Sequence, residues 1–251
     1  IPFCKSKCSY CDFCSVANSA LHIEFLTAIK TEIEHRSQFY NDIVFTSIYF
    51  GGGTPSLFKP SYIESIIESL FLNYKIAKNA EITLEANPDD LSSEYLKSTK
   101  SLNINRLSIG LQSLDDNILK LMRRRHDSKT AINSVFEAAS AGFENVSADI
   151  IYGIDGLSTL ELANQLEKML SLPITHLSAY HLGIEPGTLL FKQLQNGKTQ
   201  KISEEESFNH FTTVINTASK FGFDQYEISN FAKDGKISKH NSSYWDRSIY
   251  A

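Results

Sequence analysis

Short apolar, β-branched runs alternate along the chain with longer segments in which apolar positions recur every three or four residues. The short runs predict β-strands, and the longer segments predict amphipathic helices. The predicted strands are Thr46–Phe50, Glu81–Ala86, Arg106–Leu111, Val146–Tyr152, His176–Leu182 and Gln225–Ser229, with a first strand ending near Ile1–Phe3. The predicted helices are His22–Arg36, Tyr62–Leu72, Ser93–Leu102, Asp116–Arg124, Lys129–Ala141, Thr159–Leu170 and Glu204–Phe221.

The order of these elements predicts an α/β fold. Ser61 and Ser128 are expected to cap helix N-termini, and Gly142 and Gly222 to end helices. Strands that alternate with helices are expected to be parallel and joined by right-handed crossovers. We therefore predict a partial, TIM-like (β/α) barrel, which periodicity alone does not separate from a doubly wound sheet. In both folds, ligands bind at the carboxyl ends of the strands.

Composition narrows the class of protein. The chain has 251 residues, with 24 basic and 29 acidic side chains and a net charge of −5, so no basic footprint predicts a nucleic-acid partner. No apolar run has the length of a membrane helix. We expect a cytoplasmic protein with reduced thiols, and we expect the chain to be truncated at both ends.

All four cysteines lie near the start of the chain, at Cys4, Cys8, Cys11 and Cys14. A disulfide framework would spread cysteines along a small secreted domain, and a zinc site would pair two close ligands with two distant ones. The C-x3-C-x2-C spacing of the first three favours an iron–sulfur cluster, whose ligands are soft thiolates. Cys14 is either a fourth ligand or a free thiol.

Polar residues follow the predicted strands at the ends where ligands are expected. A glycine triplet, Gly51–Gly53, follows the first complete strand, and the triplet would let the backbone approach a ligand. Glu85 and Asp149 stand among apolar neighbours, and Gln112 ends a third strand. A buried carboxylate needs a partner. These strand ends and the cysteine loop are therefore expected to form one site.

These motifs together resemble the radical S-adenosylmethionine (SAM) superfamily, and within it the branch of oxygen-independent coproporphyrinogen III oxidases and HemW heme chaperones. The cysteine loop, with Tyr10 before its last ligand, is similar to the superfamily's motif. The resemblance to the branch extends along the chain through the strings YFGGGTPS, LEANPDDL, RLSIGLQS, DIIYGI, LSAYHLGIEPGT and YEISNFA.

The resemblance implies a 4Fe–4S cluster on Cys4, Cys8 and Cys11 whose fourth iron binds SAM. An electron delivered to the cluster by a donor would cleave SAM and give a 5′-deoxyadenosyl radical. The protein would orient this chemistry and exclude water. The residues that match SAM-contact positions of the family are Tyr10, Gly52, Gly53, Thr54, Glu85, Gln112, Arg124 and Asp149.

Two details separate the members of the branch. In the oxidases a cysteine follows the third ligand after one residue, where this chain has Phe13. HemW-like members have an Asp-Phe-aromatic-Ser string at this point, and Cys14 is therefore interpreted as a substitution of the aromatic residue. The string from His240 to Trp245 resembles the HNxxYW motif of the chaperones. His240 is the candidate axial ligand of heme, and His181 is a weaker alternative.

The sequence thus favours a HemW-like chaperone that binds heme as cargo and delivers it to a recipient protein. Oxidative decarboxylation of coproporphyrinogen III is the first alternative, and an electron-transfer iron–sulfur protein without SAM chemistry is the second. Residues 1–222 are expected to form the radical SAM core, and residues 223–251 to begin a C-terminal region.

Overall fold

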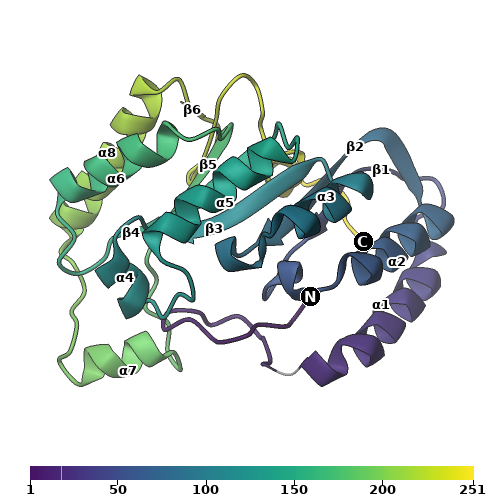
Figure 1. Cartoon of the computed structure of the whole chain (residues 1–251), viewed down its shortest axis with the longest axis horizontal. Helices are drawn as coiled ribbons and strands as arrows, with labels where there is room; N and C mark the ends of the chain where they lie inside the picture. The colour runs from purple at the N-terminus through teal and green to yellow at the C-terminus, as the bar shows by residue number, and fades with distance from the viewer. Residues whose placement is uncertain (18) are drawn as a thin grey trace.

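A single mixed sheet organises the chain and curls into an open half-barrel (Figure 1). The computed structural model describes residues 1–17 and 19–251. The strand order is β1-β2-β3-β4-β5-β7-β6, with parallel pairing from β1 to β5 and antiparallel pairing of β7 with both neighbours. The strands are β1 (Val44–Phe50), β2 (Lys75–Ala86), β3 (Arg106–Gln112), β4 (Val146–Tyr152), β5 (His176–His181), β6 (Asp224–Gln225) and β7 (Asn230–Ala232). The predicted partial parallel barrel is confirmed.

Helices connect the strands and cover the outer face of the sheet. Figure 1 shows α3, α5 and α6 lying along that face. The α-helices are α1 (His22–Ser37), α2 (Pro60–Asn73), α3 (Ser93–Ser101), α4 (Asp116–Leu121), α5 (Ser128–Ser140), α6 (Thr159–Leu170), α7 (Leu189–Gln195), α8 (Glu204–Lys220) and α9 (Lys239–Trp245). Short 3-10 turns lie at Ser19–Leu21, Pro55–Leu57 and Pro88–Asp90. No helix in the described ranges is both long enough and apolar enough to cross a membrane.

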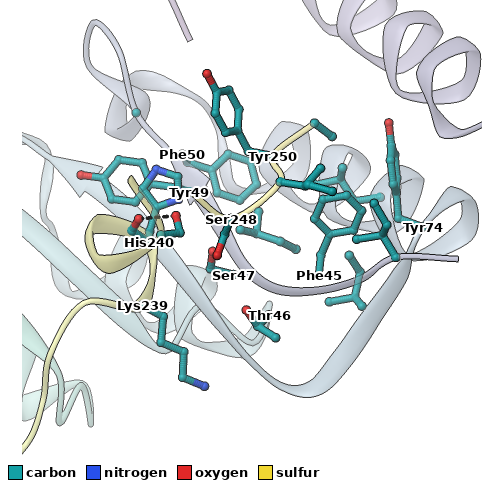
Figure 2. A pocket seen from close by; sticks show the side chains of 18 of the residues that line it. Phe45, Thr46, Ser47, Tyr49, Phe50, Tyr74, Lys239, His240, Ser248 and Tyr250 are labelled. Atoms are coloured by element: carbon teal, nitrogen blue, oxygen red, sulfur yellow. Dashed lines mark hydrogen bonds between the residues drawn. The ribbon is translucent and has the colours of Figure 1, made fainter. Parts of the chain in front are cut away.

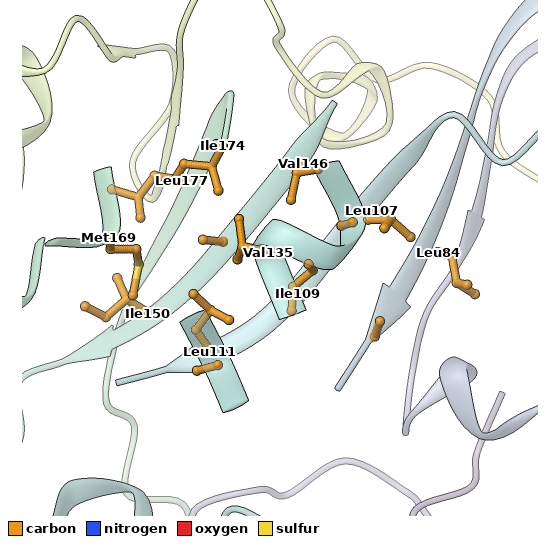
Figure 3. Close-up of a cluster of buried hydrophobic side chains, with 14 of the residues drawn as sticks. Leu84, Leu107, Ile109, Leu111, Val135, Val146, Ile150, Met169, Ile174 and Leu177 are labelled. Carbon is orange, nitrogen blue, oxygen red and sulfur yellow. The ribbon is translucent and has the colours of Figure 1, made fainter. Parts of the chain in front are cut away.

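The two faces of the sheet differ in chemistry because successive side chains of a strand point to opposite sides. On β3, Leu107, Ile109 and Leu111 are fully buried and pack toward Val135 of α5 (Figure 3). Truncating such a residue to alanine costs about 2–5 kcal/mol. The other face of the strands carries polar side chains into the half-barrel, among them Glu81, Thr83, Glu85, Arg106, Ser108, Asp149, His176 and Ser178. The polar interior is where a site can form.

The strand predicted at Gln225–Ser229 is wrong. Only Gln225 of that range belongs to a strand, and the chain turns before β7. The Glu227 side chain accepts hydrogen bonds from Ser229 N at 2.9 Å and from the amide of Asn230, so local bonds replace a ladder. At Ile1–Phe3, the structure has one isolated bridge between Phe3 and Val16.

The predicted helix Asp116–Arg124 is too long. α4 ends at Leu121 because Arg123 has a left-handed φ of 56°. Arg124 therefore leaves the helix axis, although its N–H still donates to Leu119 O at 2.8 Å. This early end turns Arg124 toward the half-barrel.

The predicted helix caps are partly right. Gly142 and Gly222 follow helices with φ of 88° and 79°, as expected for C-terminal stops. The N-cap predictions are each wrong by one or two residues. Lys59 precedes α2, with Pro60 in the first turn, and the Asp127 side chain caps α5 by accepting from Thr130 N at 2.8 Å. The short helices α7 and α9 were not predicted.

Candidate functional site

The N-terminal segment carries the cysteines and is fixed to the sheet by its backbone. Gly53 N donates to Ile1 O at 2.9 Å, and Thr54 N donates to Phe3 O at 2.7 Å. A Cβ at Gly53 would lie 2.6 Å from Phe3 O, so only glycine allows this approach. The glycine triplet thus allows the cysteine segment to pack directly against the backbone that follows β1.

Ser9, within the cysteine loop, holds the loop at its other end. Its side chain is buried and donates to Leu121 O at 2.8 Å, and its N–H donates to Met122 O at 3.1 Å. Its carbonyl accepts from Leu190 N at 2.7 Å. The ends of α4 and α7 therefore position the cysteine loop beneath the half-barrel, where Figure 1 shows the N-terminal segment running.

A cavity of about 500 Å³ lies between this loop and the carboxyl ends of the strands. The structure brings together here every residue that the sequence proposed for the cluster and for SAM. They are Cys4, Cys8, Tyr10, Cys11, Gly52, Gly53, Thr54, Glu85, Gln112, Arg124 and Asp149. Segments separated by more than a hundred residues thus share one lining.

The three proposed cluster cysteines differ from Cys14. All four thiols are free, but Cys14 is exposed and does not line the cavity. The Thr54 hydroxyl donates to Cys4 Sγ at 3.5 Å, and Arg124 Nη1 donates to Cys8 Sγ at 3.4 Å. Such donors favour thiolates. The donor set therefore fits an iron–sulfur cluster at the first three cysteines.

The burial of Cys11 adds a condition on metal binding. Burial raises the pKa of its thiol, and a bound cation would favour the thiolate. Among the described residues, no three His, Cys, Asp or Glu side chains converge as a site for one metal ion. In a cluster of several irons, each of these cysteines could bind a different iron.

Glu85 is the next-to-last residue of β2 and lies beside the glycine triplet. Its carboxylate accepts from the Tyr49 hydroxyl at 2.7 Å and from Gly52 N at 3.2 Å. Burial raises its pKa to about 7, although the Tyr49 hydrogen bond works in the opposite direction. A ligand ammonium group would stabilise the charged form. Glu85 can therefore bind the amino group of an amino-acid ligand.

Arg124 crosses the end of β3 and contacts the cluster loop. Its Nη2 donates to Gly110 O at 2.8 Å and also to the side chain of Asn87. A Cβ at Gly110 would lie 2.9 Å from Gln112 Nε2 and 3.3 Å from Arg124 Nη2. Gln112 has a φ of 65°, beside an irregularity in the β3–β4 ladder that aims its amide. Gly110 thus leaves room for both side chains.

Asp149 lies on β4, deeper in the half-barrel. It accepts from Ser108 Oγ at 3.1 Å and from Ser147 Oγ at 3.3 Å. Burial raises its pKa to about 6, against the opposing effects of these hydroxyls and of Arg106. Near neutral pH it can accept hydrogen bonds from ligand hydroxyl groups.

His240 lies outside this cavity and lines a second, larger one of about 1130 Å³ (Figure 2). The larger cavity runs along β1 toward α1, α2 and the C-terminal residues. The His240 ring stacks on Tyr49 with centroids 4.3 Å apart, and its Nε2 lies 3.1 Å from Tyr244 Oη. Tyr49 lines both cavities. The alternative candidate, His181, lines the smaller cavity and bonds Ser207 Oγ at 2.8 Å.

The buried carboxylate of Glu81 fixes α9, which carries His240. It accepts from Ser238 Oγ at 3.3 Å and from the N–H groups of Lys239 and His240, each at 3.2 Å. A carboxylate at a helix N-terminus satisfies free N–H groups and complements the helix dipole.

Sequence reasoning missed four contributors to the site, namely Tyr49, Glu81, Arg106 and Gly110. Glu81, Arg106 and Gly110 share the inward register of Glu85 and Gln112 on their strands. For Glu81 and Arg106 the available signal was a charged residue at alternate positions within an otherwise apolar strand.

The chain is similar to a protein superfamily and to several known proteins. The family model described as the radical SAM superfamily matches residues 1–170. The chain is 36% identical to radical S-adenosyl methionine domain-containing protein 1, mitochondrial, of Danio rerio, covering 97% of this chain and 55% of that protein. It is 34% identical to heme chaperone HemW of Bacillus subtilis, covering 100% of this chain and 66% of that protein. The chain thus spans between about half and two thirds of these relatives.

A solved structure shares the fold. The coproporphyrinogen III oxidase HemN of Escherichia coli, described as a radical SAM enzyme, superposes with a TM-score of 0.83 at 22% identity. The match covers 98% of this chain and 56% of that one. At this identity the likeness establishes the half-barrel, and it leaves the reaction to be argued from the site.

Proposed function

The chain belongs to the radical SAM superfamily, and from this premise we propose that it is the core of a HemW-like heme chaperone. In this proposal Cys4, Cys8 and Cys11 hold a 4Fe–4S cluster, and SAM binds beside it in the smaller cavity. The observation that carries the proposal is the common cavity lined by the cysteines and the strand-end residues. The bound cluster supplies the electron chemistry of SAM cleavage, while the protein supplies orientation and exclusion of water.

The proposed SAM contacts follow from the chemistry of each side chain. Glu85 binds the ammonium group and Arg124 the carboxylate of the methionine portion, alongside Gly52, Gly53 and Thr54. Asp149 and Gln112 bind hydroxyl groups or ring edges of the nucleoside, and the backbone of Tyr10 contacts the adenine. The support is that oppositely charged groups of the protein line the same cavity as the cysteine loop.

Heme is the proposed cargo, with His240 as an axial ligand. The larger cavity has the volume of a site for a cofactor-sized ligand, and aromatic side chains line it. The Tyr49 and Tyr244 rings beside His240 offer stacking surfaces. The 30–34% identity to several proteins named heme chaperone HemW further supports this assignment.

Further parts of the proposal concern the whole protein. An electron donor would reduce the cluster, a recipient protein would accept heme, and the location would be cytoplasmic. Residues 1–222 would form the radical SAM core, and residues 223–251 would begin a C-terminal region.

The test is a paired assay on the full-length protein after anaerobic cluster reconstitution. One arm titrates heme against the wild type, His240→Ala and the control His35→Ala, which removes an exposed histidine of α1. The other arm follows decarboxylation of coproporphyrinogen III with SAM and a reductant. We expect heme binding that His240→Ala weakens and His35→Ala leaves intact, without decarboxylation.

Each contrary result identifies an alternative. Sustained decarboxylation would replace the chaperone proposal with the oxidase function. An intact cluster that yields no 5′-deoxyadenosine and binds neither SAM nor heme would indicate an electron-transfer protein.

A further inference from the structure

Three polar side chains, Tyr226, His176 and Ser147, connect α9 to Asp149 through the interior of the half-barrel, and they are called the polar row here. Ser147 Oγ lies 2.7 Å from His176 Nδ1, and His176 Nε2 lies 2.8 Å from Tyr226 Oη. At the inner end, Ser147 Oγ lies 3.3 Å from Asp149 Oδ1. Ser147 and His176 are fully buried, and they are directly paired in the register of β4 and β5. The polar row is therefore fixed by the pairing of the strands.

The protonation state of His176 restricts how hydrogen bonds run along the polar row. Burial, together with the charge of Arg106, holds the pKa of His176 well below its ordinary value, so the ring is neutral near pH 7. A neutral imidazole has one N–H donor and one acceptor nitrogen, and a serine or tyrosine hydroxyl has one proton to donate. The direction of one hydrogen bond in the polar row therefore fixes the direction of the others.

The contacts of Tyr226 set this direction at the outer end. Burial raises the pKa of the Tyr226 hydroxyl, whereas hydrogen bonds with the Ser238 backbone and the Asn241 side chain lower it. A hydrogen bond that lowers the pKa of a tyrosine is one that its oxygen accepts. The Tyr226 oxygen thus accepts from the start of α9, and its own proton is left for His176 Nε2.

The carboxylate of Asp149 sets the same direction at the inner end. An ionised carboxylate only accepts hydrogen bonds, so the Ser147 hydroxyl donates to Asp149, as the Ser108 hydroxyl does at 3.1 Å. His176 Nδ1–H then donates to Ser147 Oγ. Both ends therefore agree, and every proton of the polar row points from α9 toward Asp149.

We propose that the polar row positions Asp149 as a charged acceptor for the ribose hydroxyl groups of SAM, with His176 as the positioning residue that sets the direction. A hydroxyl held with its proton toward a carboxylate stabilises the ionised form, which keeps its other lone pairs for a ligand in the cavity. The contact between Asp149 and ribose rests on the proposed function. The direction of the polar row rests on hydrogen bonds within the protein.

Other groups also act on Asp149, and the choice of probe has to exclude their titration. The charged and titratable groups that interact with Asp149 from the neighbouring strands are Tyr49, Glu85, Arg106 and Tyr180. Glu85 has a pKa of about 7 and is the proposed partner of the SAM ammonium group, so SAM would report on two carboxylates. Nucleosides that lack the amino-acid portion report on Asp149 without this contribution.

The experiment uses the full-length, cluster-reconstituted protein with adenosine and its 2′,3′-dideoxy analogue, which lacks the ribose hydroxyl groups. Calorimetry measures both affinities between roughly pH 5 and 8 for the wild type and Tyr226→Phe. The matched control is Tyr95→Phe, because the Tyr95 hydroxyl is buried without a hydrogen bond in the described part of the chain. Nitrogen NMR of the ligand-free protein shows which ring nitrogen of His176 carries the proton, and His176→Gln identifies its signals.

We expect the His176 proton on Nδ1 and a pH dependence that only adenosine shows. Wild-type affinity for adenosine should fall as the pH drops through about 6, where Asp149 becomes protonated. Tyr226→Phe frees His176 to accept the Ser147 proton, so Asp149 loses a donor and its pKa rises. The midpoint should then move up by about one pH unit, a tenfold loss of affinity below it, with no loss well above it. Tyr95→Phe should match the wild type.

Three results would overturn the proposal. A proton on Nε2 of His176 would reverse the polar row. An equal loss of adenosine affinity at every pH in Tyr226→Phe would give the row a structural role alone, and equal pH profiles of the two nucleosides would remove the ribose contact. If the wild type binds neither SAM nor adenosine, the SAM part of the proposed function fails, while nitrogen NMR still decides the direction of the row. Because NMR and the comparison of nucleosides use the wild type, they also decide if Tyr226→Phe misfolds.

Discussion

His240 lies face to face with Tyr49, with ring centroids 4.3 Å apart and 17° between the ring planes. The hydroxyl of the same tyrosine donates to Glu85 at 2.7 Å. Tyr49 of β1 therefore contacts both His240, the candidate axial ligand of heme, and Glu85, a residue proposed to bind SAM. Tyr49 also lines both the smaller and the larger cavity.

The cluster assignment predicts unequal effects of the cysteines. Cys14→Ser should retain iron and sulfide at wild-type content because Cys14 is exposed and away from the cavity. Cys11→Ser should lose most of the cluster, since Cys11 lines the cavity beside the other two. Iron analysis and visible absorption after anaerobic reconstitution measure both. Loss of the cluster in Cys14→Ser together with its retention in Cys11→Ser would show that Cys14 is the third ligand in place of Cys11.

Glu85 predicts how stability depends on pH. Its folded pKa of about 7 exceeds the ordinary value of 4.5 because burial disfavours the charge. The folded state therefore favours protonated Glu85. The contribution of Glu85 to the free energy of unfolding is fully present below pH 4.5 and is lost as the pH rises through about 7. The ligand-free protein should lose up to about 3 kcal/mol from this group between roughly pH 5 and 8.

Thermal unfolding across that pH range checks this prediction. Glu85→Gln should flatten the decline, whereas Glu94→Gln, at an exposed position of α3, should leave it unchanged. SAM should reduce the decline in the wild type by supplying an ammonium group. An equal slope for wild type and Glu85→Gln would contradict the buried-carboxylate explanation.

The anchoring of α9 predicts a local effect of Glu81. Glu81→Ala removes the acceptor of three hydrogen bonds at the start of the helix and should cost about 1–3 kcal/mol. Amide hydrogen exchange should accelerate over 239–245, and heme affinity should fall with the freed His240. Glu161→Ala, which removes the capping carboxylate of α6, is the matched control and should leave both properties intact. Protected α9 amides in Glu81→Ala would show that other contacts hold the helix.

The close approach of Gly53 to Phe3 predicts that Gly53→Ala will disturb the cysteine segment. The new methyl group would lie 2.6 Å from Phe3 O and 2.8 Å from Phe3 N, so the segment must move. We expect a stability loss of about 1–3 kcal/mol and reduced iron content. Gly142→Ala controls for backbone strain, because its φ is 88° but no atom lies within 4 Å of the new Cβ. Equal iron loss in both variants would show that the close approach of Gly53 to Phe3 is not what retains the iron.

Those strands, helices and motifs that depend on nearby residues could be predicted from the amino-acid sequence. Alternation on β3 places Leu107 and Ile109 against helices and Ser108 inside the half-barrel, and periodicity is sufficient to predict it. Cysteine spacing and polar strand ends likewise identified one candidate site, because parallel strands bring their carboxyl ends together. The prediction of a strand at Gln225–Ser229 was wrong because hydrogen bonds to the Glu227 side chain competed with strand pairing.

The interaction partners of the site residues depend on how distant segments pack together. Arg124 enters the cavity because Arg123 breaks α4, while Arg125 is engaged by Asp89 and Asp90. The stacking of His240 on Tyr49 and the electrostatic interaction of Arg106 with Asp149 depend on segments that are distant in sequence. Local patterns report which face a side chain takes, but burial and pairing depend on packing between distant segments, which no local pattern contains.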